Sequence, residues 1–518
     1  MNEARIGATP GRQVLRALQR YPDRTAFAWE DGSLTYRATA HLIGQMQHVF
    51  VSAGLMRGQK IAVLAGNRAD AWCAGVAAQA LGLAITPLHP LASLDDHIYQ
   101  MVDADVQALI VDVAAFAARG EELAAAVRLD HVFTLGRAGF GVDLLAAAIA
   151  AGNASPIDIA RPEDLAILNY TGGTTGRSKG TFRRNSGVIA STASILADFE
   201  ISHGARYLAV APISHVAGSK VVPTLVRGGT IHLLRGFQPD QVLRTIAEQR
   251  ITLALFVPTM IYHLLDNPAL DTTDLSSLEL LLYGASAMSP ARLAEGLARI
   301  GPVFAQLYGQ TEAYPLATLS RSDHDAARPE LFASCGFAVT SADVRLIGDD
   351  GEEIATGQVG EICARGPMVM DGYWKQPEQT AEALSGGWLH TGDMAYANEE
   401  GYLYIVDRKK DMIVSGGFNI YPKAVEDVLT SHPSVSAAAV IGVPDAYWGE
   451  AVTALVVMRS EAEVAPEALI DAVKQRLGAV HAPKRVEFVT ELPMTGLGKV
   501  DKKTLRDRFW SGNERQVG

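Results

Sequence analysis

The stretch LAILNYTGGTTGRSKG, residues 165–180, joins an apolar run of strand length to a loop that is rich in glycine and threonine. The glycines let several backbone N–H groups point into one concavity, and the threonines and Lys179 add hydroxyl donors and a positive charge. Such a loop directly after a buried strand favours phosphate binding over the alternative, an ordinary surface turn. Because Ser178 stands where the common P-loop has glycine before its lysine, this is a phosphate loop of another kind.

Outward from this loop, apolar runs of strand length alternate with stretches of helix length. Most of the runs are almost entirely apolar, as in strands that are buried on both faces of a mainly parallel sheet. The alternation predicts an α/β fold. The predicted strands are residues 60–66, 106–112, 131–136, 165–170, 207–212, 230–235, 253–258 and 278–284, with a helix at 237–250.

The pattern changes twice toward the C-terminus. From about residue 340, short alternating segments separated by Asp-Gly and Gly turns predict an antiparallel β module. The last ~110 residues predict a small α+β domain, in which helical periodicity alternates with apolar strands. Its predicted helices are residues 421–432 and 466–478, and its predicted strands are 436–444 and 451–459.

The composition is that of an ordinary globular protein. The 518 residues are 48% hydrophobic and 20% charged, and the net charge of −12 argues against nucleic acid as a partner. The N-terminus has no apolar core of signal-peptide length, and the longest apolar runs are shorter than the ~18 residues that span a bilayer. We therefore expect a cytoplasmic protein without an integral membrane segment. The spacing of Cys73, Cys335 and Cys363 suits neither a metal cluster nor a disulfide framework.

Two motifs place a carboxylate close to glycine. In QLYGQTEA (306–313), Glu312 would hold Mg²⁺ beside a triphosphate, although a Gly turn followed by Thr-Glu also suits the start of a helix. In WLHTGD (388–393), Asp393 would bind both hydroxyls of a ribose, although a plain turn residue is the simpler interpretation.

Two further motifs lie near the C-terminus. DRKKDMIVSGGFNIYP (407–422) passes from mixed charge into Gly-Gly where the composition shifts, which indicates a linker or hinge. PMTGLGKVDKKTLR (493–506) places Lys499 beside glycine on a flexible tip, where the alternative is a solvated surface lysine.

Taken together, in this order and at these spacings, the motifs resemble those of the adenylate-forming enzymes, which include acyl-CoA synthetases, aryl-CoA ligases and luciferases. The resemblance extends from TYRATA near residue 35 to KKTLR near residue 506. It implies ATP, Mg²⁺ and coenzyme A, with transfer of AMP to a carboxylate and release of pyrophosphate. It also implies a large N-terminal domain of helix-flanked sheets over residues 1–408, with a β-barrel-like module at about 340–408, and a small mobile α+β domain over 409–518.

The resemblance assigns a role to each matching residue. Lys410 would be the hinge, Thr311 the α-phosphate donor, Glu312 the Mg²⁺ ligand, and Lys499 the bridge between substrate carboxylate and α-phosphate. Tyr308 would stack on adenine, and Asp393 and Arg408 would bind the ribose. The other implied ATP-binding residues are Thr171, Gly172, Gly173, Thr174, Thr175, Gly176, Lys179, Gly284, Ala285, Ser286 and Gly309, and the implied coenzyme A segment is Ser415, Gly416 and Gly417. Gly172 and Ser178 depart from the Ser and Pro that are common in the family.

The segment PISHVAGSKVV (212–222) bears on the choice of acid. His215 matches the histidine that acyl- and aryl-CoA ligases carry beside the carboxylate, although it would also suit a helix cap, and the aspartate of amino-acid-activating members is absent. Lys220 is expected to point to solvent; pointing inward, it would pair a second carboxylate. Small and apolar side chains with one hydroxyl predict a pocket for an apolar fatty or aromatic acid. The predicted lining is His215, Ala217, Val221, Gly284, Ala285, Tyr314 and Leu316.

These expectations combine into an AMP-forming acyl-CoA synthetase that acts on a small-molecule carboxylic acid. Two alternatives stay open: a ligase that delivers the acyl group to the phosphopantetheine of a carrier protein, and a catalytically silent nucleotide-binding regulator. Retention of Glu312, Asp393, Arg408 and Lys499 counts against the second. A homodimer is left open.

Overall fold

The computed structural model describes residues 8–171, 178–459, 464–494 and 500–510. Its first large sheet has nine strands in the order β16-β15-β14-β13-β12-β10-β11-β1-β2. The six strands from β14 to β1 are parallel, and both ends of the sheet are antiparallel. The strands are β1 (Thr25–Trp29), β2 (Gly32–Thr35), β10 (Arg206–Ala209), β11 (Thr230–Leu233), β12 (Leu253–Phe256), β13 (Leu280–Gly284), β14 (Phe304–Tyr308), β15 (Ala317–Leu319) and β16 (Phe337–Ala338).

The second large sheet has eight strands in the order β19-β9-β8-β4-β3-β5-β6-β7 and is parallel from β8 to β7. The predicted phosphate loop connects β8 to β9, which pair in antiparallel fashion, so a strand and not a helix follows this loop. The strands are β3 (Lys60–Leu64), β4 (Ala84–Pro87), β5 (Ala108–Val111), β6 (His131–Thr134), β7 (Val142–Asp143), β8 (Leu165–Tyr170), β9 (Gly180–Arg184) and β19 (Gly372–Tyr373).

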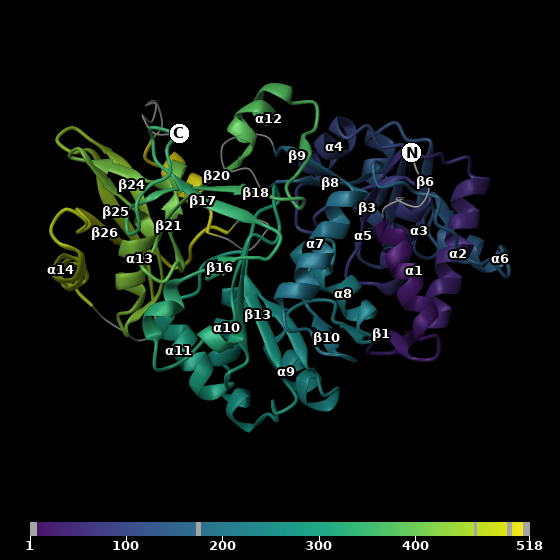
Figure 1. Cartoon of the computed structure of the whole chain (residues 1–518), viewed down its shortest axis with the longest axis horizontal. Helices are drawn as coiled ribbons and strands as arrows, with labels where there is room; N and C mark the ends of the chain where they lie inside the picture. Colours follow the sequence, from purple (N-terminus) through teal and green to yellow (C-terminus); the bar gives the residue numbers. More distant parts are fainter. Residues whose placement is uncertain (1–7, 172–177, 460–463, 495–499, 511–518) are drawn as a thin grey trace.

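Helices form layers between and outside these two sheets (Figure 1). One apolar core joins both sheets through α1, α2, α3 and α8. Separate cores pack α9, α10 and α11 on the outer face of the nine-stranded sheet, and α4 and α5 on that of the eight-stranded sheet. The helices are α1 (Pro10–Arg20), α2 (Tyr36–Ser52), α3 (Ala69–Ala80), α4 (Leu94–Asp103), α5 (Val113–Ala126), α6 (Leu144–Ala150), α7 (Asn185–Asp198), α8 (Val221–Val226), α9 (Pro239–Glu248), α10 (Pro258–Leu265), α11 (Pro290–Arg299) and α12 (Pro377–Ala383).

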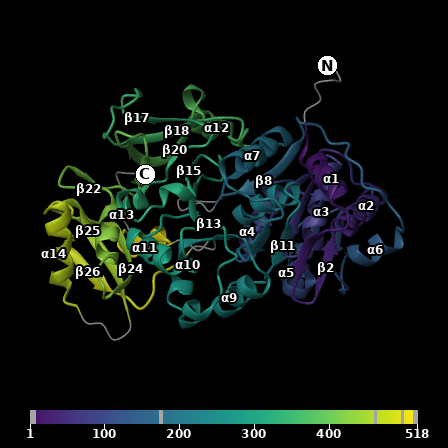
Figure 2. The ribbon, with the colours of Figure 1, turned by 60° about the horizontal axis from the view of Figure 1, so that its bottom comes forward.

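A four-stranded antiparallel sheet follows at the residues where the β module is predicted. Its order is β17-β18-β20-β21, and a bridge between Gly336 and Leu403 links it to the nine-stranded sheet. In Figure 2 it lies with α12 above the strands of that sheet. The strands are β17 (Asp343–Ile347), β18 (Gly360–Arg365), β20 (Leu389–Ala397) and β21 (Leu403–Arg408).

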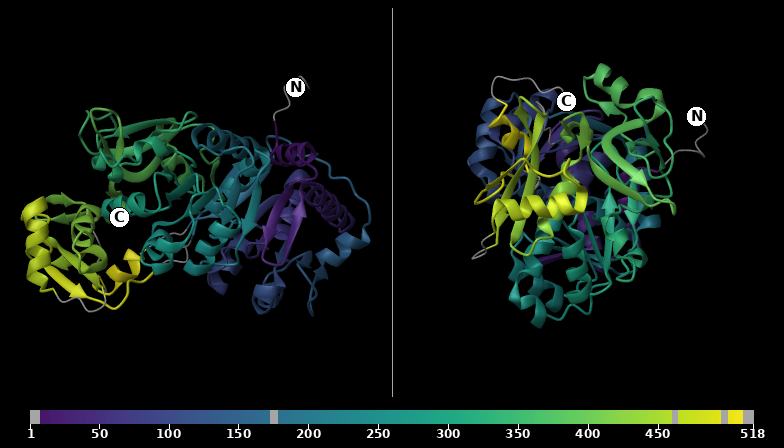
Figure 3. Two further views of the ribbon diagram at one scale, coloured as in Figure 1. Left: turned by 90° about the horizontal axis from the view of Figure 1, so that it is seen from below. Right: turned by 90° about the vertical axis from the view of Figure 1, so that its left-hand side faces the viewer.

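The C-terminal elements form a lobe at the end of the molecule opposite α2 and α6 (Figures 1 and 3). Its sheet runs β23-β22-β25-β24, with β26 parallel to β25, and three helices pack on it, so the predicted α+β domain is confirmed. The elements are β22 (Ile413–Ser415), β23 (Phe418–Ile420), α13 (Pro422–Thr430), β24 (Val435–Asp445), β25 (Gly449–Met458), α14 (Pro466–Leu477), β26 (Arg485–Phe488) and α15 (Lys502–Asp507). In the described part of the chain, no helix combines the length and the apolar character that a bilayer span requires.

Candidate functional site

Asp393 is the centre of a hydrogen-bonded cluster at the end of β14. Its Oδ2 accepts from the Tyr308 hydroxyl at 2.7 Å and from Gln310 Nε2 at 2.5 Å, and its Oδ1 lies 2.5 Å from Arg408 Nε. The antiparallel register of β20 and β21 places Asp393 directly opposite Arg408. The two residues predicted to bind the ribose are therefore brought together, and the sequence did not reveal Gln310 as their partner.

The charges in this cluster support one another. The Asp393 carboxylate raises the pKa of Arg408, and burial together with that carboxylate raises the pKa of Tyr308 well above its ordinary value. Tyr308 therefore stays protonated and donates to Asp393. The predicted adenine contact would have to use the face of the Tyr308 ring, because its hydroxyl is held by Asp393.

Tyr373 connects the predicted Mg²⁺ ligand to the phosphate loop. Its hydroxyl donates to Glu312 Oε1 at 2.9 Å, and Lys179 Nζ lies 4.8 Å from the centre of its ring. The Thr171 backbone N–H donates to the Lys179 carbonyl at 2.9 Å, which closes the base of the loop. The residues Gly172, Gly173, Thr174, Thr175, Gly176 and Lys499 lie outside the described residues.

The segment after β14 is irregular, so the alternative interpretation of Thr-Glu as a helix start is wrong. Buried Arg183 fixes this segment: its Nη2 donates to the Thr311 carbonyl at 2.5 Å and its Nε to the Met368 carbonyl at 3.1 Å. The Met370 N–H donates to the Glu312 carbonyl at 2.7 Å. The sequence pointed to neither Arg183 nor Tyr373, because the partners of both lie far away in the chain.

Glu312 fits a Mg²⁺ site of the kind that uses few protein ligands. No group of three or more potential ligands among His, Cys, Asp and Glu exists in the described ranges. Mg²⁺ commonly uses one or two carboxylates together with waters and substrate phosphates, so a lone carboxylate beside a phosphate loop suits it.

Close contacts leave no room for a side chain at Gly284 and Gly309, which lie at the ends of β13 and β14. A Cβ on Gly284 would lie 2.4 Å from the Leu307 carbonyl oxygen, and one on Gly309 would lie 2.8 Å from Cδ2 of Tyr314. Ala285, directly after β13, has a φ of +66°, which is rare for a residue with a side chain and typical of functional sites. Ser286 is exposed.

His215 is held as a neutral imidazole. Its ring meets the His89 ring edge-on with the centroids 4.5 Å apart, and its Nδ1 lies 2.8 Å from Ser214 Oγ. Burial and the neighbouring His89 lower the pKa of His215 to about 3. Its side chain makes no capping hydrogen bond to the 3₁₀ helix η2 (Val216–Lys220) that follows, so the capping interpretation is wrong.

The other predicted pocket residues differ in burial. Val221 packs in the core between the two large sheets, and Ala217 is buried, with its carbonyl accepting from the Tyr207 hydroxyl at 2.9 Å. Leu316 is fully buried in the core beneath the antiparallel module. Only Tyr314 and Ala285 combine a place in the predicted lining with a half-buried surface and a position next to the glycines described above.

Lys220 does not point to solvent as expected. It is fully buried, and its Nζ donates to the Tyr314 hydroxyl at 2.5 Å and to Ser219 Oγ at 3.0 Å. The Nζ also lies 5.1 Å from the Phe199 ring centre and 4.9 Å from that of Tyr314. Burial lowers the pKa of Lys220 to about 7.

We expect Lys220→Met to raise the Tm most at neutral pH and progressively less in alkaline solution. Because burial lowers the pKa of Lys220 from 10.5 to about 7, the unfolded chain binds more protons than the folded chain between these values. The free-energy cost of keeping the Lys220 charge buried in the folded state is therefore full below a pH of about 7. It then falls by up to about 1.4 kcal/mol per pH unit and is lost toward pH 10.5. Melting curves of wild type and variant measure the difference. The matched control is Lys474→Met, at an exposed position of α14. A Tm difference between wild type and Lys220→Met that is equal in neutral and in alkaline solution would contradict the buried charge.

The predicted coenzyme A segment forms a tight hairpin between β22 and β23. Gly416 and Gly417 have φ values of +59° and +81°, as the two central positions of such a turn require. The Gly416 N–H donates to the Trp448 carbonyl at 2.8 Å, and a Cβ on Gly416 would lie 2.9 Å from the Trp448 ring. Ser415 is buried beside this turn. The turn geometry and the contact with Trp448 thus explain why glycine stands at both positions. A contact of these glycines with coenzyme A stays a prediction.

The junction between the two parts of the chain is a short 3₁₀ turn, η7 (Lys409–Asp411), which contains the predicted hinge Lys410. Burial lowers the pKa of Lys410. Before the turn, the Asp407 carboxylate accepts from the Lys423 backbone N–H at the start of α13, at 2.9 Å. Asp411, the last residue of the turn, pairs with Arg506 at 2.6 Å.

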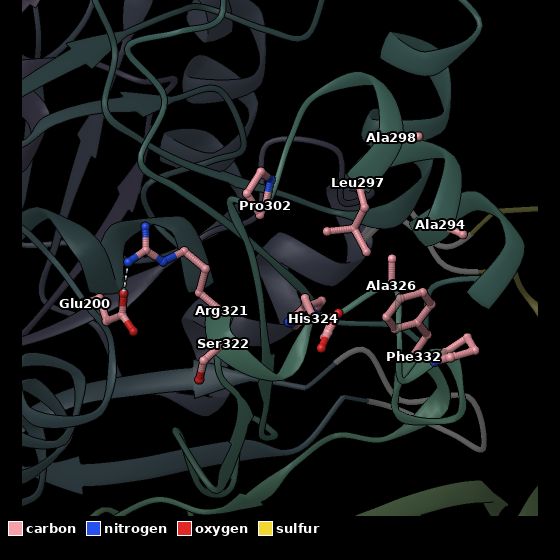
Figure 4. Close-up of a pocket in the computed structure, with 12 residues that line it drawn as sticks. Glu200, Ala294, Leu297, Ala298, Pro302, Arg321, Ser322, His324, Ala326 and Phe332 are labelled. Atoms are coloured by element: carbon pink, nitrogen blue, oxygen red, sulfur yellow. Dashed lines mark ion pairs between the residues drawn. The ribbon is translucent and has the colours of Figure 1, made fainter.

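A separate cavity of about 720 Å³ lies beside α11 (Figure 4). Its wall is mostly apolar, with an ion pair of 2.8 Å between Arg321 and Glu200 at one side. None of the predicted site residues lines it, and His324 on its wall is occupied by the Tyr283 hydroxyl and the Ser320 carbonyl. It is therefore not the site that the motifs predict.

Comparison with known proteins identifies two family models in the chain. The AMP-binding enzyme model matches residues 14–374, and the AMP-binding enzyme C-terminal domain matches residues 424–499. A medium/long-chain fatty-acid–CoA ligase of Mycobacterium tuberculosis is 43% identical over 98% of this chain and 91% of its own length. A feruloyl-CoA synthase of an Amycolatopsis species is 35% identical over 98% of this chain and 100% of its own. The solved structure of the amide bond synthetase McbA from Marinactinospora thermotolerans superposes with a TM-score of 0.90 at 36% identity, covering 96% of this chain and 100% of that one.

Proposed function

The chain belongs to the AMP-binding enzyme family, and we propose that it is an AMP-forming acyl-CoA synthetase. It activates an apolar fatty or aromatic carboxylic acid as the acyl-adenylate, releases pyrophosphate, and transfers the acyl group to the thiol of coenzyme A. The observation that best supports this proposal is the grouping of Asp393, Arg408 and Gln310 next to the Glu312–Tyr373 pair. One carboxylate is then available for a ribose and another for a metal-bound phosphate.

In the first half-reaction, a carboxylate oxygen of the acid attacks the α-phosphorus of ATP. A new P–O bond forms, the bond from the α-phosphorus to the bridging oxygen breaks, and pyrophosphate leaves with that electron pair. Lys179 and the 171–179 loop hold the β- and γ-phosphates, and Asp393 and Arg408 hold the ribose. Glu312 would hold Mg²⁺, which when bound neutralises charge on the phosphate oxygens. Thr311 and Lys499 contact the α-phosphate.

Neutral His215 suits the place beside the acid. A protonated imidazole would hold the substrate carboxylate in an ion pair and weaken it as a nucleophile. Because the pKa of His215 is lowered to about 3, the ring orients the carboxylate through a hydrogen bond without pairing its charge. Ala285, which is half-buried and small, leaves room beside it for an apolar acyl or aryl group.

In the second half-reaction, the C-terminal domain (409–518) rotates about Lys410 relative to residues 1–408. The Ser415–Gly416–Gly417 hairpin then lies over the adenylate and admits the pantetheine arm. The thiolate attacks the carbonyl carbon, a C–S bond forms, and the bond from this carbon to the phosphate oxygen breaks as AMP leaves. A carrier-protein phosphopantetheine would use the same path. An amine is a further candidate acceptor because of the similarity to an amide bond synthetase.

The proposal is tested in two steps with purified protein. A panel of aliphatic, aromatic and amino acids is incubated with ATP and Mg²⁺, and pyrophosphate is measured. Acids that respond are then given coenzyme A, a phosphopantetheinylated carrier protein or a simple amine, and the acyl product is identified by mass spectrometry. We expect fatty or aromatic acids and coenzyme A to give the fastest turnover. Absence of pyrophosphate release with every acid would leave only the silent nucleotide-binding regulator.

The same proposal places the enzyme in the cytoplasm and gives it no nucleic-acid partner. Light scattering of the purified protein decides whether it forms a homodimer.

Glu312→Gln is expected to lower acyl-adenylate formation by at least roughly a hundredfold, since even the partners of metal ligands contribute about 10–100-fold. The amide keeps the size of the side chain and can still accept from Tyr373, but it loses the charge that holds the metal. Pyrophosphate release at limiting Mg²⁺ is the measurement, and Glu382→Gln on exposed α12 is the matched control. An unchanged dependence on Mg²⁺ would contradict the assignment of Glu312 as ligand.

A further inference from the structure

Below its pKa of about 7, Lys220 is a buried cation without an anion. In the described part of the chain, no carboxylate lies within ion-pair distance of its Nζ; the groups that face it are the Tyr314 hydroxyl, the Ser219 hydroxyl and two aromatic rings. Buried charges in proteins are normally paired, and a lysine kept in an apolar surrounding costs stability. A residue retained at such a cost is a candidate for binding a ligand.

The hydrogen bonds leave Lys220 ready to donate once more. An ammonium group has three donors, and the two assigned acceptors are Tyr314 Oη and Ser219 Oγ. Ser219 in turn donates to the Val216 carbonyl at 2.6 Å, so its hydroxyl is oriented to accept from Lys220. Within the described residues, the third Nζ donor has no assigned acceptor.

The location of Lys220 links this donor to the acid site. It ends the 3₁₀ helix that begins directly after His215, and its partner Tyr314 follows Glu312 by two residues in the loop after β14. The Tyr314 ring packs against Gly309 at the base of the same loop and is half-buried, whereas Lys220 is fully buried. Lys220 is therefore joined by a hydrogen bond to Tyr314, which is a half-buried member of the predicted acyl-pocket lining.

We propose that Lys220 and Tyr314 form the polar end of the acid pocket and bind an oxygen acceptor at the far end of the substrate. The ligand class is a carboxylic acid with a second oxygen function, either a second carboxylate or a phenolic hydroxyl, on an otherwise apolar body. The proposal rests on the proposed function, because it concerns the acid of the same reaction. In this proposal the pocket is apolar along its length and carries one pair of hydrogen-bond donors, Lys220 and Tyr314, at its end.

The two oxygen functions differ in what they supply. A second carboxylate would give Lys220 the missing counter-charge, whereas a phenolic oxygen would accept one hydrogen bond and place its ring against Tyr314. A site that is built to hydrogen-bond a substrate group discriminates strongly against the analogue that lacks this group, because its own polar atoms then stay unpaired. An alkyl end would leave the Lys220 donor unsatisfied.

The experiment compares matched acids in wild type and two variants. The pairs are a dicarboxylic acid against the monocarboxylic acid of equal length, and a 4-hydroxycinnamic acid against its 4-methyl analogue. For each acid, kcat/KM for pyrophosphate release is measured together with the Kd by calorimetry. The ratio of interest is kcat/KM for the oxygenated acid of a pair divided by kcat/KM for its matched partner. In wild type we expect this ratio to be ten or more for at least one pair. Lys220→Met, a substitution of similar length, should reduce this ratio at least tenfold while the methyl-ended acid is retained.

Tyr314→Phe is the second variant, because it keeps the ring and removes only the hydroxyl. It should reduce the same ratio by a smaller factor, and melting curves show whether either variant is merely unfolded. A wild-type ratio near one in both pairs, or a ratio unchanged in both variants, would overturn the proposal. The calorimetric Kd does not need turnover, so a chain that binds these acids selectively without releasing pyrophosphate would disprove the enzymatic function and leave this inference standing.

Discussion

Lys499→Ala is expected to abolish acyl-adenylate formation and to spare thioester formation from acyl-adenylate supplied ready-made. The first half-reaction brings a carboxylate and an α-phosphate together, both of them anionic, and a positive charge between them lowers that repulsion. Removing one such preorganised donor costs roughly a hundred- to a thousandfold in rate. The second half-reaction joins a thiolate to a carbonyl carbon, and in the proposed rotation about Lys410 the C-terminal domain would carry Lys499 away before it.

The two half-reactions are measured separately, by pyrophosphate release and by consumption of chemically made acyl-adenylate with coenzyme A. Lys503→Ala is the matched control, since this lysine lies four residues further along the same motif in α15. Loss of thioester formation together with adenylation would give Lys499 a role in the acceptor site or in folding.

Much of the fold could be predicted from the sequence because buried parallel strands are nearly continuous apolar runs. The predicted strand at 165–170 is β8 to the residue, and the other predicted strands start within two residues of the observed ones. The change to Asp-Gly turns near residue 340 likewise marked the antiparallel sheet. The order of the strands was not predictable. β1 lies between β2 and β11, about two hundred residues apart in the chain, and such a pairing leaves no local pattern.

The residues of the candidate site likewise fall into those that the sequence revealed and those that only the structure shows. Glycines, Asp393 and Glu312 stand out because turn chemistry and carboxylates are visible in a short window of sequence. Arg183 and Tyr373 do not, because they act through contacts with residues 128 and 61 positions away in the chain. Lys220 shows the limit most clearly: a lysine in an amphipathic segment is usually solvated. Only the packing of Phe199 and Tyr314 around its Nζ reveals that it points inward.

Lys410→Pro is expected to give the opposite result to Lys499→Ala: adenylation is spared and thioester formation falls by orders of magnitude. Lys410 lies in the middle of η7, where 3₁₀ geometry has a φ near that of proline. The φ of proline therefore fits the turn at position 410 itself but prevents the large change in φ that a rotating domain needs at its hinge. The contact of Asp407 with the start of α13, which joins the two sides of Lys410, would then help to hold the C-terminal domain in one orientation.

Both half-reactions and a melting curve are needed for this variant, because proline also disfavours helical geometry at Lys409 and some loss in Tm is expected. Lys410→Ala is the matched control: it removes the same charge but leaves the backbone free, so both half-reactions should survive in it. Equal loss in both half-reactions of Lys410→Pro, or loss in neither, would contradict the hinge. Loss of adenylation alone would keep the hinge and would mean that proline locks the thioester-forming orientation. The comparison of proline with alanine at one position thus separates the backbone from the charge, and the pattern of the two half-reactions identifies which orientation the turn η7 holds.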